Sequence, residues 1–344
     1  MRFFTACVTS IGVFIALAAG SDSPSLMDLP LIGYVAQSSP PELRAIVGVP
    51  GAAVLTDPLP LPSNVRRIHL PPDQQYVLLE RSEGDPAVLL LNGDDTNQMI
   101  PIPGALSAPN IVAFSRSGSS VVLFGKSTGR LQVITGLPHA PSIAQVFDTT
   151  LLPDIPRALS VSDDGRYLLA SSPSIVYEMA DTLTHIVANV AGVPSLAFLP
   201  ANAGAVIGDR SAGLVYVVEN RAAGPTTKVV ATDLAGLGDI SPAEDGETLY
   251  ISNPSGNRIW SLRVSTRELG SYELAVRPAR IEHLRNIDMF LIVSGIDQPA
   301  WIFFRQGQDF KTVFVPAAPH FQKRRIQPPG RLPPAAGLAT VRPQ

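Results

Sequence analysis

Cysteine is almost absent from this sequence, and neither sign of charge is in large excess. The 344 residues contain one cysteine, Cys7, and 26 Lys and Arg against 29 Asp and Glu give a formal net charge of -3. A chain without a surplus of Lys and Arg releases few counterions from nucleic-acid phosphates, so we exclude nucleic acid as a partner. Because Cys7 lies in the N-terminal segment discussed next, we expect a mature chain without disulfides or a nucleophilic thiol. Packing alone must then hold the fold.

Long apolar runs are scarce, and only one approaches the length of a membrane span. It extends from Phe3 to Ala19, follows the positive charge of Arg2 and ends in small residues suited to cleavage. We therefore predict a signal peptide over residues 1–20, a linker over 21–30, and export to the periplasm or the extracellular space. An uncleaved membrane anchor is the alternative. The mature chain is then expected to have no membrane span.

Metal-binding histidine motifs are also missing. No pair among the five histidines has the spacing of a His-x-x-x-His motif, and no phosphate-binding glycine loop precedes a predicted helix. Whether the protein is an enzyme is therefore left open by its motifs.

Proline and glycine, in contrast, recur throughout the chain, and so does one type of phrase. The 33 prolines and 27 glycines suit many short strands joined by turns. Six phrases place an apolar burst after a short polar turn. We align them on Leu70, Phe114, Val161, Phe198, Ile240 and His283, which are spaced by 37 to 47 residues. A repeat of this length is typical of a propeller blade.

Each copy continues with two further apolar runs, which gives four predicted strands per copy. In the third copy, "SVSDDGRYLLAS" (160–171) is followed by "SIVYE" and "HIVANV". Apolar residues often stand at successive positions, as expected for sheets that neighbours cover on both faces. The sequence therefore predicts an all-β fold, a β-propeller with four-stranded antiparallel blades.

The number of blades depends on the N-terminal strands. Three apolar runs at 31–36, 43–49 and 52–57 lie outside the six copies, and the stretch from Leu31 to Pro316 is long enough for seven blades. We favour seven blades, with the N-terminal strands packed beside the last copy to close the ring and protect sheet edges. Six blades with an added flap is the alternative. The propeller domain is placed at 31–316.

The repeat resembles that of known bacterial propellers. The phrases "SVSDDGRYLLAS" and "DGETLYISNPSGNRIWSL" (245–262) are similar to the repeats of the YVTN/NHL-type and lactonase-like β-propellers. The likeness covers roughly residues 30 to 316. It departs from the pattern at 66–80 and 279–294, where the turn glycine is missing.

The resemblance implies a place for a metal ion. Lactonase-like propellers hold a metal in the channel through carboxylate and amide oxygens, and Asp239 and Glu282 precede the aligned positions of neighbouring copies. His69 is the equivalent residue in the first copy. A divalent metal such as calcium is therefore one hypothesis for the channel. Polar side chains that only contact channel water, with no cofactor, are the other.

A second candidate surface lies where the innermost strands begin. Asparagine and arginine residues recur there, and forked guanidinium groups bind carboxylates and anionic glycans. The residues are Asn64, Arg66, Asn110, Arg157 and Arg280.

The C-terminal segment 317–344 differs from the rest of the chain. It is rich in proline, has five basic residues and no acidic one, and is predicted to be a flexible tail.

Three functions are consistent with these observations. The favoured one is an exported, non-catalytic, monomeric propeller that binds a protein, small-molecule or glycan ligand on one face in the cell envelope. The alternative is a metal-dependent, lactonase-like hydrolase with its site in the central channel. A structural envelope component tethered by an uncleaved N-terminus is the third.

Overall fold

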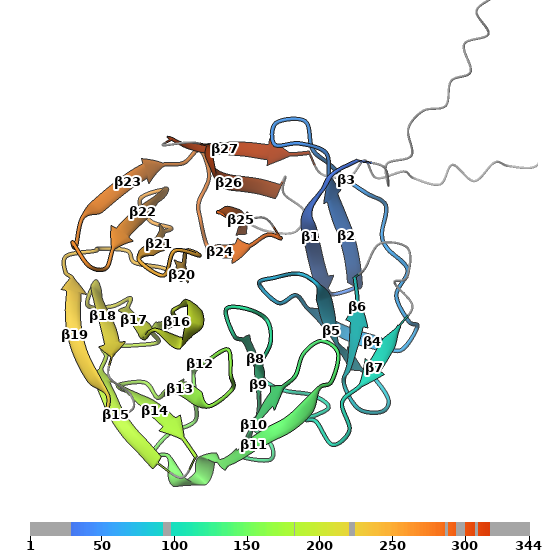
Figure 1. Cartoon of the computed structure of the whole chain (residues 1–344), viewed down its shortest axis with the longest axis horizontal. Helices are drawn as coiled ribbons and strands as arrows, with labels where there is room; N and C mark the ends of the chain where they lie inside the picture. The colour runs from blue at the N-terminus through green and yellow to red at the C-terminus, as the bar shows by residue number, and fades with distance from the viewer. Residues whose placement is uncertain are drawn as a thin grey trace, which may run out of the picture.

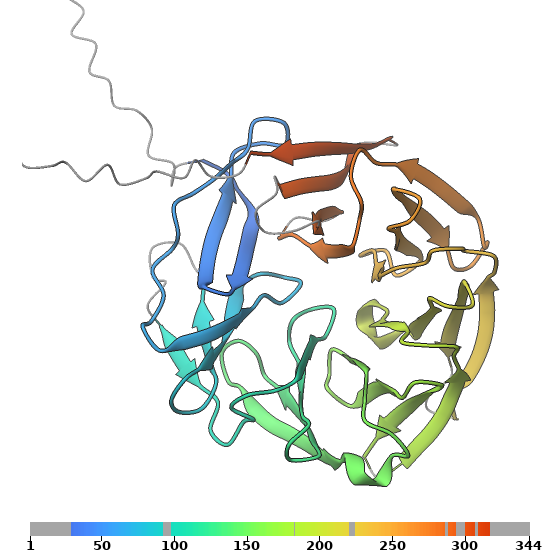
Figure 2. The same ribbon diagram turned by 180° about the vertical axis from the view of Figure 1, so that it is seen from behind.

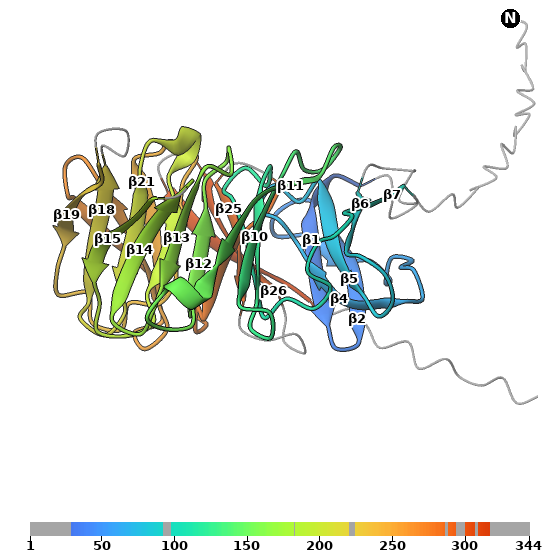
Figure 3. The same cartoon turned by 90° about the horizontal axis from the view of Figure 1, so that it is seen from below.

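The computed structural model describes residues 29–91, 98–181, 183–219, 224–285, 288–293, 300–306 and 309–316. In these residues the chain forms seven antiparallel sheets, arranged as blades around a common axis (Figure 1). The same closed ring is seen from behind (Figure 2). From the side, the strands run between the two faces of a flat disc (Figure 3). The protein is therefore a seven-bladed β-propeller, as the repeat predicts, and the six-bladed alternative is wrong.

Six of the blades have four strands, numbered from the inside outward. The second blade has β4 (Val65–His69), β5 (Tyr76–Arg81), β6 (Ala87–Leu90) and β7 (Met99–Pro101). The third has β8 (Ile111–Phe114), β9 (Val121–Gly125), β10 (Arg130–Thr135) and β11 (Ser142–Asp148). The fourth has β12 (Ala158–Val161), β13 (Tyr167–Ser171), β14 (Ile175–Ala180) and β15 (Leu183–Asn189).

The remaining blades continue the same pattern. The fifth has β16 (Ser195–Phe198), β17 (Ala205–Asp209), β18 (Leu214–Glu219) and β19 (Thr226–Ala231). The sixth has β20 (Ile240–Pro242), β21 (Thr248–Asn253), β22 (Arg258–Arg263) and β23 (Leu269–Glu273). The seventh has β24 (Arg280–His283), β25 (Met289–Val293), β26 (Ala300–Gln306) and β27 (Asp309–Val315). Two short 3-10 turns, η2 (Thr149–Leu151) and η3 (Pro200–Asn202), are the helical segments of the described residues.

Strand position within a blade explains the apolar pattern. The second strands, such as β9 (Val121–Gly125), are buried along their whole length because a neighbouring blade covers each face. The outer strand β11 (Ser142–Asp148) alternates between exposed and half-buried side chains. Apolar clusters fill the space between consecutive sheets, as Val217 of β18 and Leu249 of β21 illustrate. Mutual coverage of these faces is the main source of stability.

The first blade departs from the expected four strands. It has three in the described residues: β1 (Leu31–Ser38), β2 (Pro41–Val47) and β3 (Val54–Leu55). β1 runs from Tyr34, beside Gln74, to Ser38, whose hydroxyl donates to the carbonyl of Ile68 at 3.2 Å. This is the direction of the second strands elsewhere. The innermost position of this blade therefore has no strand in the described part of the chain.

The N-terminal blade nevertheless closes the ring as predicted. Its sheet packs on one side against the second blade, where Leu43 meets Leu79, and on the other against the seventh, where Ile46 meets Ile302. The closure thus consists of sheet-on-sheet packing between the two ends of the propeller (Figure 1).

The side chain of Gln74 makes some of the hydrogen bonds that an innermost strand would make to β1. Its Oε1 accepts a hydrogen bond from the Tyr34 backbone N–H at 2.7 Å, and its Nε2 donates to the Tyr34 carbonyl at 3.2 Å. The same Nε2 donates to the carbonyl of His283 in the seventh blade at 3.2 Å. One side-chain amide from the second blade therefore satisfies backbone groups of the first and the seventh, which would otherwise be buried without partners.

Two backbone features allow this approach. Gln74 has φ of 50°, in the left-handed region that few side chains other than glycine adopt. Gly33 lies against it, and a Cβ on Gly33 would stand 2.6 Å from Gln74 Oε1. Glycine is needed here because the side-chain amide comes so close to the strand.

The predicted signal peptide, the first part of the linker and the tail 317–344 lie outside the described residues. Within the described ranges, no helix has the length and apolar character needed to cross a membrane.

We predict that Gln74→Ala lowers the free energy of unfolding by about 2–4 kcal/mol. The substitution leaves the buried N–H and C=O groups of Tyr34 and the C=O group of His283 without their hydrogen-bond partner. Urea denaturation measures this. Gln75→Ala, at the exposed neighbouring position, is the matched control and should leave the midpoint unchanged. Equal stability of the two variants would contradict the role given to Gln74.

Candidate functional site

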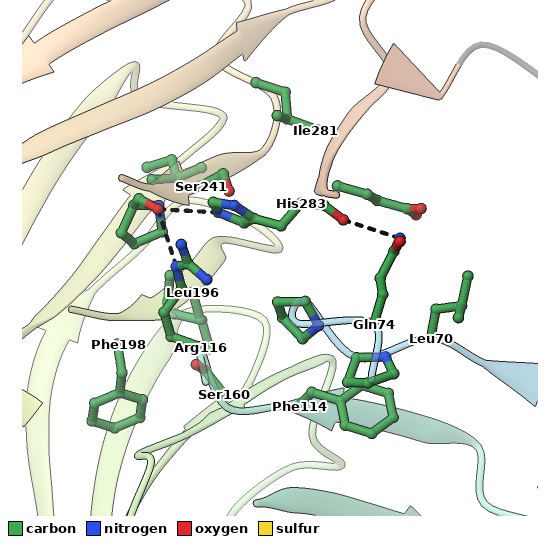
Figure 4. A pocket seen from close by; sticks show the side chains of 16 residues that line it. Leu70, Gln74, Phe114, Arg116, Ser160, Leu196, Phe198, Ser241, Ile281 and His283 are labelled. Atoms are coloured by element: carbon green, nitrogen blue, oxygen red, sulfur yellow. Dashed lines mark hydrogen bonds between the residues drawn. The ribbon is translucent and has the colours of Figure 1, made fainter. Parts of the chain in front are cut away.

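A cavity of about 220 Å³ lies on the propeller axis, between the ends of the innermost strands. Apolar side chains such as Phe114, Phe198 and Ile281 form part of its wall, and one side is closed by the turn that carries Gln74 (Figure 4). Its polar wall residues come from five blades: Gln74, Arg116, Ser160, Ser241, Glu282 and His283. We call this space the channel cavity. It is small even for a small-molecule site, since such pockets usually measure about 300–1,000 Å³.

Glu282 is the acidic residue of the channel cavity. It lies on β24, and its Oε1 is 2.8 Å from a guanidinium nitrogen of Arg280. Desolvation in the channel raises the pKa of Glu282 above its usual range. Arg280 opposes this shift, and the negative charge of Asp239 adds to it. A carboxylate with a raised pKa is a better proton acceptor than an ordinary one.

His283 is the neighbouring residue, but its ring is already engaged. Nε2 lies 3.1 Å from the carbonyl oxygen of Pro242, which can only accept, so Nε2 carries the proton (Figure 4). Burial, reinforced by the positive charge of Arg116, holds the pKa of His283 well below its usual range. The ring is therefore neutral at pH 7 and supports the inner strands of the sixth and seventh blades.

Two serine hydroxyls complete the polar wall. Ser160 of β12 and Ser241 of β20 are buried and line the cavity. Neither hydroxyl has a hydrogen-bond partner among the described residues, so both can donate to a molecule in the cavity.

A second hollow, of about 420 Å³, adjoins the channel cavity, and we call it the mouth. It is lined by the turns that join the first and second strands of successive blades, including Asp73, Ser117, Asp163 and Glu244. Arg116 lines both spaces. It pairs with Glu244 at 2.5 Å and donates to the Pro242 carbonyl at 3.3 Å (Figure 4).

The carboxylates of the mouth have local partners, and Glu244 is paired with Arg116 as described above. Asp163 accepts hydrogen bonds from the backbone N–H and the hydroxyl of Ser117, at 2.7 and 2.6 Å. Burial raises the pKa of Asp73 to about 6, although the N–H of Gln75 and the charges of Arg285 and Arg116 act in the other direction. Asp73 therefore titrates in the weakly acidic range.

The structure corrects the alignment of the fifth copy. Phe114, Val161, Phe198 and His283 each pair with the residue seven positions later, and in the fifth copy Pro242, paired with Leu249, takes this place instead of Ile240. The anchor Ile240 lies two residues too early, because β20 continues to Pro242 before the turn to β21 begins. Ser241, not Asp239, is thus the equivalent of Glu282.

The three predicted metal ligands have separate partners. Asp239 Oδ1 accepts from the Ser195 hydroxyl at 2.8 Å, with Arg210 at 3.7 Å, and Glu282 pairs with Arg280. His69 Nε2 lies 2.6 Å from Oε1 of the buried Glu80. Among the described residues, no three His, Cys, Asp or Glu side chains are placed to hold a metal ion. Asp239, Glu282 and His69 therefore do not fit a shared cation.

The five residues predicted to form an anion-binding surface make separate local contacts or are exposed to solvent. Arg66 lies at an irregularity of β4 and is exposed, Asn110 Oδ1 accepts from the Lys126 N–H at 2.7 Å, and Arg280 pairs with Glu282. Arg157 is exposed, and the Asn64 carbonyl accepts from the Ser82 N–H at 2.8 Å. All five mark the starts of innermost strands, as predicted. Ligand binding by them stays a prediction.

Five of the six polar residues of the cavity wall were not predicted from the sequence, and Ser160 is among them because it is one small residue among several at the aligned positions. Gln74 and Arg116 lie in turns that the repeat pattern does not distinguish from other turns. Ser241 was hidden by the register error, and His283 was treated only as an alignment position. The letters Gly125 to Gly129 match a Gly-x-Ser-x-Gly pattern, but they join β9 to β10 and no helix follows, so they form no nucleophile elbow.

Comparison with known proteins places the fold but no family. No protein-family model matches the chain, and no curated protein matches it in sequence. Solved structures do resemble it. A candidate 6-phosphogluconolactonase from Bacteroides fragilis superimposes with a TM-score of 0.58 at 16% identity, over 86% of this chain and 98% of that one.

Two further structures are similar. The periplasmic gluconolactonase of Pseudomonas aeruginosa gives a TM-score of 0.55 at 16% identity, over 83% of this chain and 96% of that one. A protein of unknown function from Desulfotomaculum acetoxidans gives 0.58 at 14% identity, over 83% and 95%. These likenesses support a lactonase-like propeller fold, whereas no family match supports the YVTN/NHL resemblance.

We predict that Asp73→Asn makes the protein more stable than the wild type, and only above about pH 4. The folded protein keeps the Asp73 proton up to about pH 6, whereas the unfolded chain releases it near pH 3.8. The stability that wild-type Asp73 contributes therefore falls as pH rises through this window, and then stays constant. Urea denaturation between pH 4 and 7.5 measures the difference between the two proteins.

Asp245→Asn is the control of opposite sign. Although partial burial acts to raise its pKa, hydrogen bonds from the N–H groups of Thr248 and Glu247 leave the pKa of Asp245 lowered. This variant should lose stability relative to the wild type as pH rises. A pH-independent difference for Asp73→Asn would show that its carboxyl is not the titrating group.

Proposed function

We propose that the protein is a lactonase-like hydrolase that opens a small hydroxylated lactone in the channel cavity. The observation that carries this proposal is the composition of that cavity, where the Glu282 carboxylate and the hydroxyls of Ser160 and Ser241 share one small space. The fold likeness to gluconolactonase structures supports the same reaction class. Fold alone does not establish activity, and the assignment therefore rests on Glu282, Ser160 and Ser241 in the channel cavity.

The chemistry follows from the roles that these groups can take. Glu282 accepts a proton from a water molecule, and the resulting hydroxide attacks the lactone carbonyl carbon. One of the two serine hydroxyls donates a hydrogen bond to the carbonyl oxygen as it gains negative charge, and the other donates to a ring hydroxyl of the lactone. The ring C–O bond then breaks, and the alkoxide takes the proton back from Glu282, which gives a hydroxy acid. The positive charge of Arg280 favours the ionised form of Glu282 and so opposes the effect of desolvation.

No step in this scheme uses a metal ion. The residues predicted to bind one do not form a fitting set, as described above, and a water molecule activated by a carboxylate is sufficient for an ester as reactive as a strained lactone. Elemental analysis of the purified protein tests the metal hypothesis directly.

A non-catalytic ligand-binding propeller is the second candidate. Two features favour it. The His283 ring is already hydrogen-bonded to the Pro242 carbonyl and is therefore not free to act as a catalytic base. The mouth brings charged side chains from several blades together, which suits a polar ligand. Binding of a small molecule without turnover would support it.

We also propose that the protein is exported as a monomer. The apolar N-terminal run carries this proposal, and a periplasmic neighbour of the same fold is consistent with it. N-terminal sequencing of protein from the periplasmic or secreted fraction should show a chain that begins near residue 19 or 21. Retention of Met1 in a membrane fraction would instead support the uncleaved anchor.

We predict that Glu282→Gln lowers kcat for lactone hydrolysis about 100-fold or more with little change in KM, because it removes the proton acceptor and keeps the shape. The measurement is pH-stat titration with glucono-1,5-lactone, corrected for spontaneous hydrolysis. Glu247→Gln, at an exposed position in the turn after β20, is the control and should match the wild type.

Two outcomes are informative against the proposal. Turnover that survives in Glu282→Gln would remove Glu282 from the mechanism. Absence of turnover by the wild type, together with saturable binding of the lactone, would favour the non-catalytic propeller.

A further inference from the structure

A third hollow lies away from the axis, between the sixth and seventh blades. Its volume is about 300 Å³, which is within the usual range of small-molecule sites. One wall is the face of the sixth-blade sheet β20–β23 that is turned toward strands β26 and β27 of the seventh blade. The sixth and seventh blades lie side by side (Figure 1). We call this hollow the inter-blade pocket. It shares no lining residue with the channel cavity or the mouth.

The inter-blade pocket exists because small residues replace large ones on this face. Tyr250, Ser261 and Gly270 stand side by side on β21, β22 and β23. The next pair on the same face, Ile259 and Tyr272, carries bulky side chains that fill the space toward the seventh blade. A Cβ on Gly270 would be 2.6 Å from Ser261 Oγ. Ser261 and Gly270 are small and thus leave open a space that Ile259 and Tyr272 fill further along the same face.

Aromatic rings form one side of the inter-blade pocket. The rings of Tyr272 and Phe310 have centroids 4.5 Å apart and are tilted by 53°, and Tyr250 contacts Phe310 edge-on at 5.5 Å. Tyr272 and Phe310 are only half-buried and both line the hollow. Their rings therefore offer apolar surface to a ligand, held in a fixed orientation by packing.

Charged and hydroxyl groups form the rest of the wall. Arg263 is exposed at the rim, and Arg305 approaches from β26. Glu268 adds an acceptor, and the hydroxyls of Ser261 and Thr248 lie deeper. Asp245 is near enough for Arg263 to lower the pKa of its carboxyl, and Thr248 Oγ1 donates to Asp245 at 2.8 Å. The guanidinium of Arg263 is thus partly balanced but still open to solvent.

We propose that the inter-blade pocket binds a carboxylated sugar, of the uronic-acid class. The aromatic rings suit the C–H face of a pyranose, and a guanidinium binds a carboxylate through paired N–H donors. Glu268 and the serine and threonine hydroxyls suit ring hydroxyls, which both donate and accept. A neutral sugar would leave the guanidinium without its partner. A flat aromatic acid would offer no hydroxyl groups to Glu268 and Ser261.

The test is isothermal titration of the purified protein with D-glucuronate, D-glucose and benzoate at low ionic strength. Glucuronate is expected to bind, with an affinity at least about tenfold higher than that of either glucose or benzoate. Benzoate that binds as well as glucuronate would overturn the assignment to sugars. No heat of binding with glucuronate up to tens of millimolar would overturn the site.

Two variants on one strand locate the binding. Gly270→Val fills the inter-blade pocket and should abolish glucuronate binding, whereas Ser271→Val adds the same side chain to the exposed, opposite face of β23 and should leave it unchanged. Binding that persists in Gly270→Val would place the ligand elsewhere.

A surface variant protects the test against misfolding. If Gly270→Val does not fold, Arg263→Gln should weaken glucuronate at least about tenfold and leave the urea midpoint unchanged. Equal affinity of Arg263→Gln and the wild type would contradict the role of the guanidinium. Lactone turnover in these variants should equal that of the wild type, because the channel cavity is untouched.

Discussion

A ring of sheets is stable only if its two ends meet, and here the apolar packing of the ends is joined by the hydrogen bonds of one buried side-chain amide. Gln74 presents one acceptor and one donor to the backbone of Tyr34, as a neighbouring strand would, and reaches the carbonyl of His283 as well. The first and seventh blades pack apolar side chains such as Ile46 and Ile302 against each other, and in the described residues they share no hydrogen-bonded sheet. Hydrogen bonds between the blades at the closure are therefore few in the described residues, so the loss of one removes a large share of them.

The channel cavity is a product of the same closure. Glu282 and His283 lie on the innermost strand of the seventh blade, and Gln74 fixes the end of that strand against the second blade. The first blade provides no inner strand in the described residues, so turns from its neighbours form that part of the wall. Structural irregularity and candidate chemistry thus occur at one place, as is common where local rules are broken for function.

Sequence patterns could predict the architecture because blade packing leaves a periodic trace. Apolar runs such as Val121–Gly125 recur every forty or so residues since each is covered on both faces. The site was less accessible. Asp239 and Ser241 differ by two positions, and only the hydrogen-bonded register shows which of them is equivalent to Glu282. Gln74 could not be found, because its role depends on contacts with Tyr34 and His283, which are distant in sequence.

The three-stranded first blade has a mechanical consequence. Its sheet has three strands in the described residues, and it meets its neighbours through side-chain packing, because the hydrogen-bonded ladders run within blades and not between them. A force that pulls the first and seventh blades apart would therefore act against apolar contacts such as that of Ile46 with Ile302, and not against a ladder of strand hydrogen bonds.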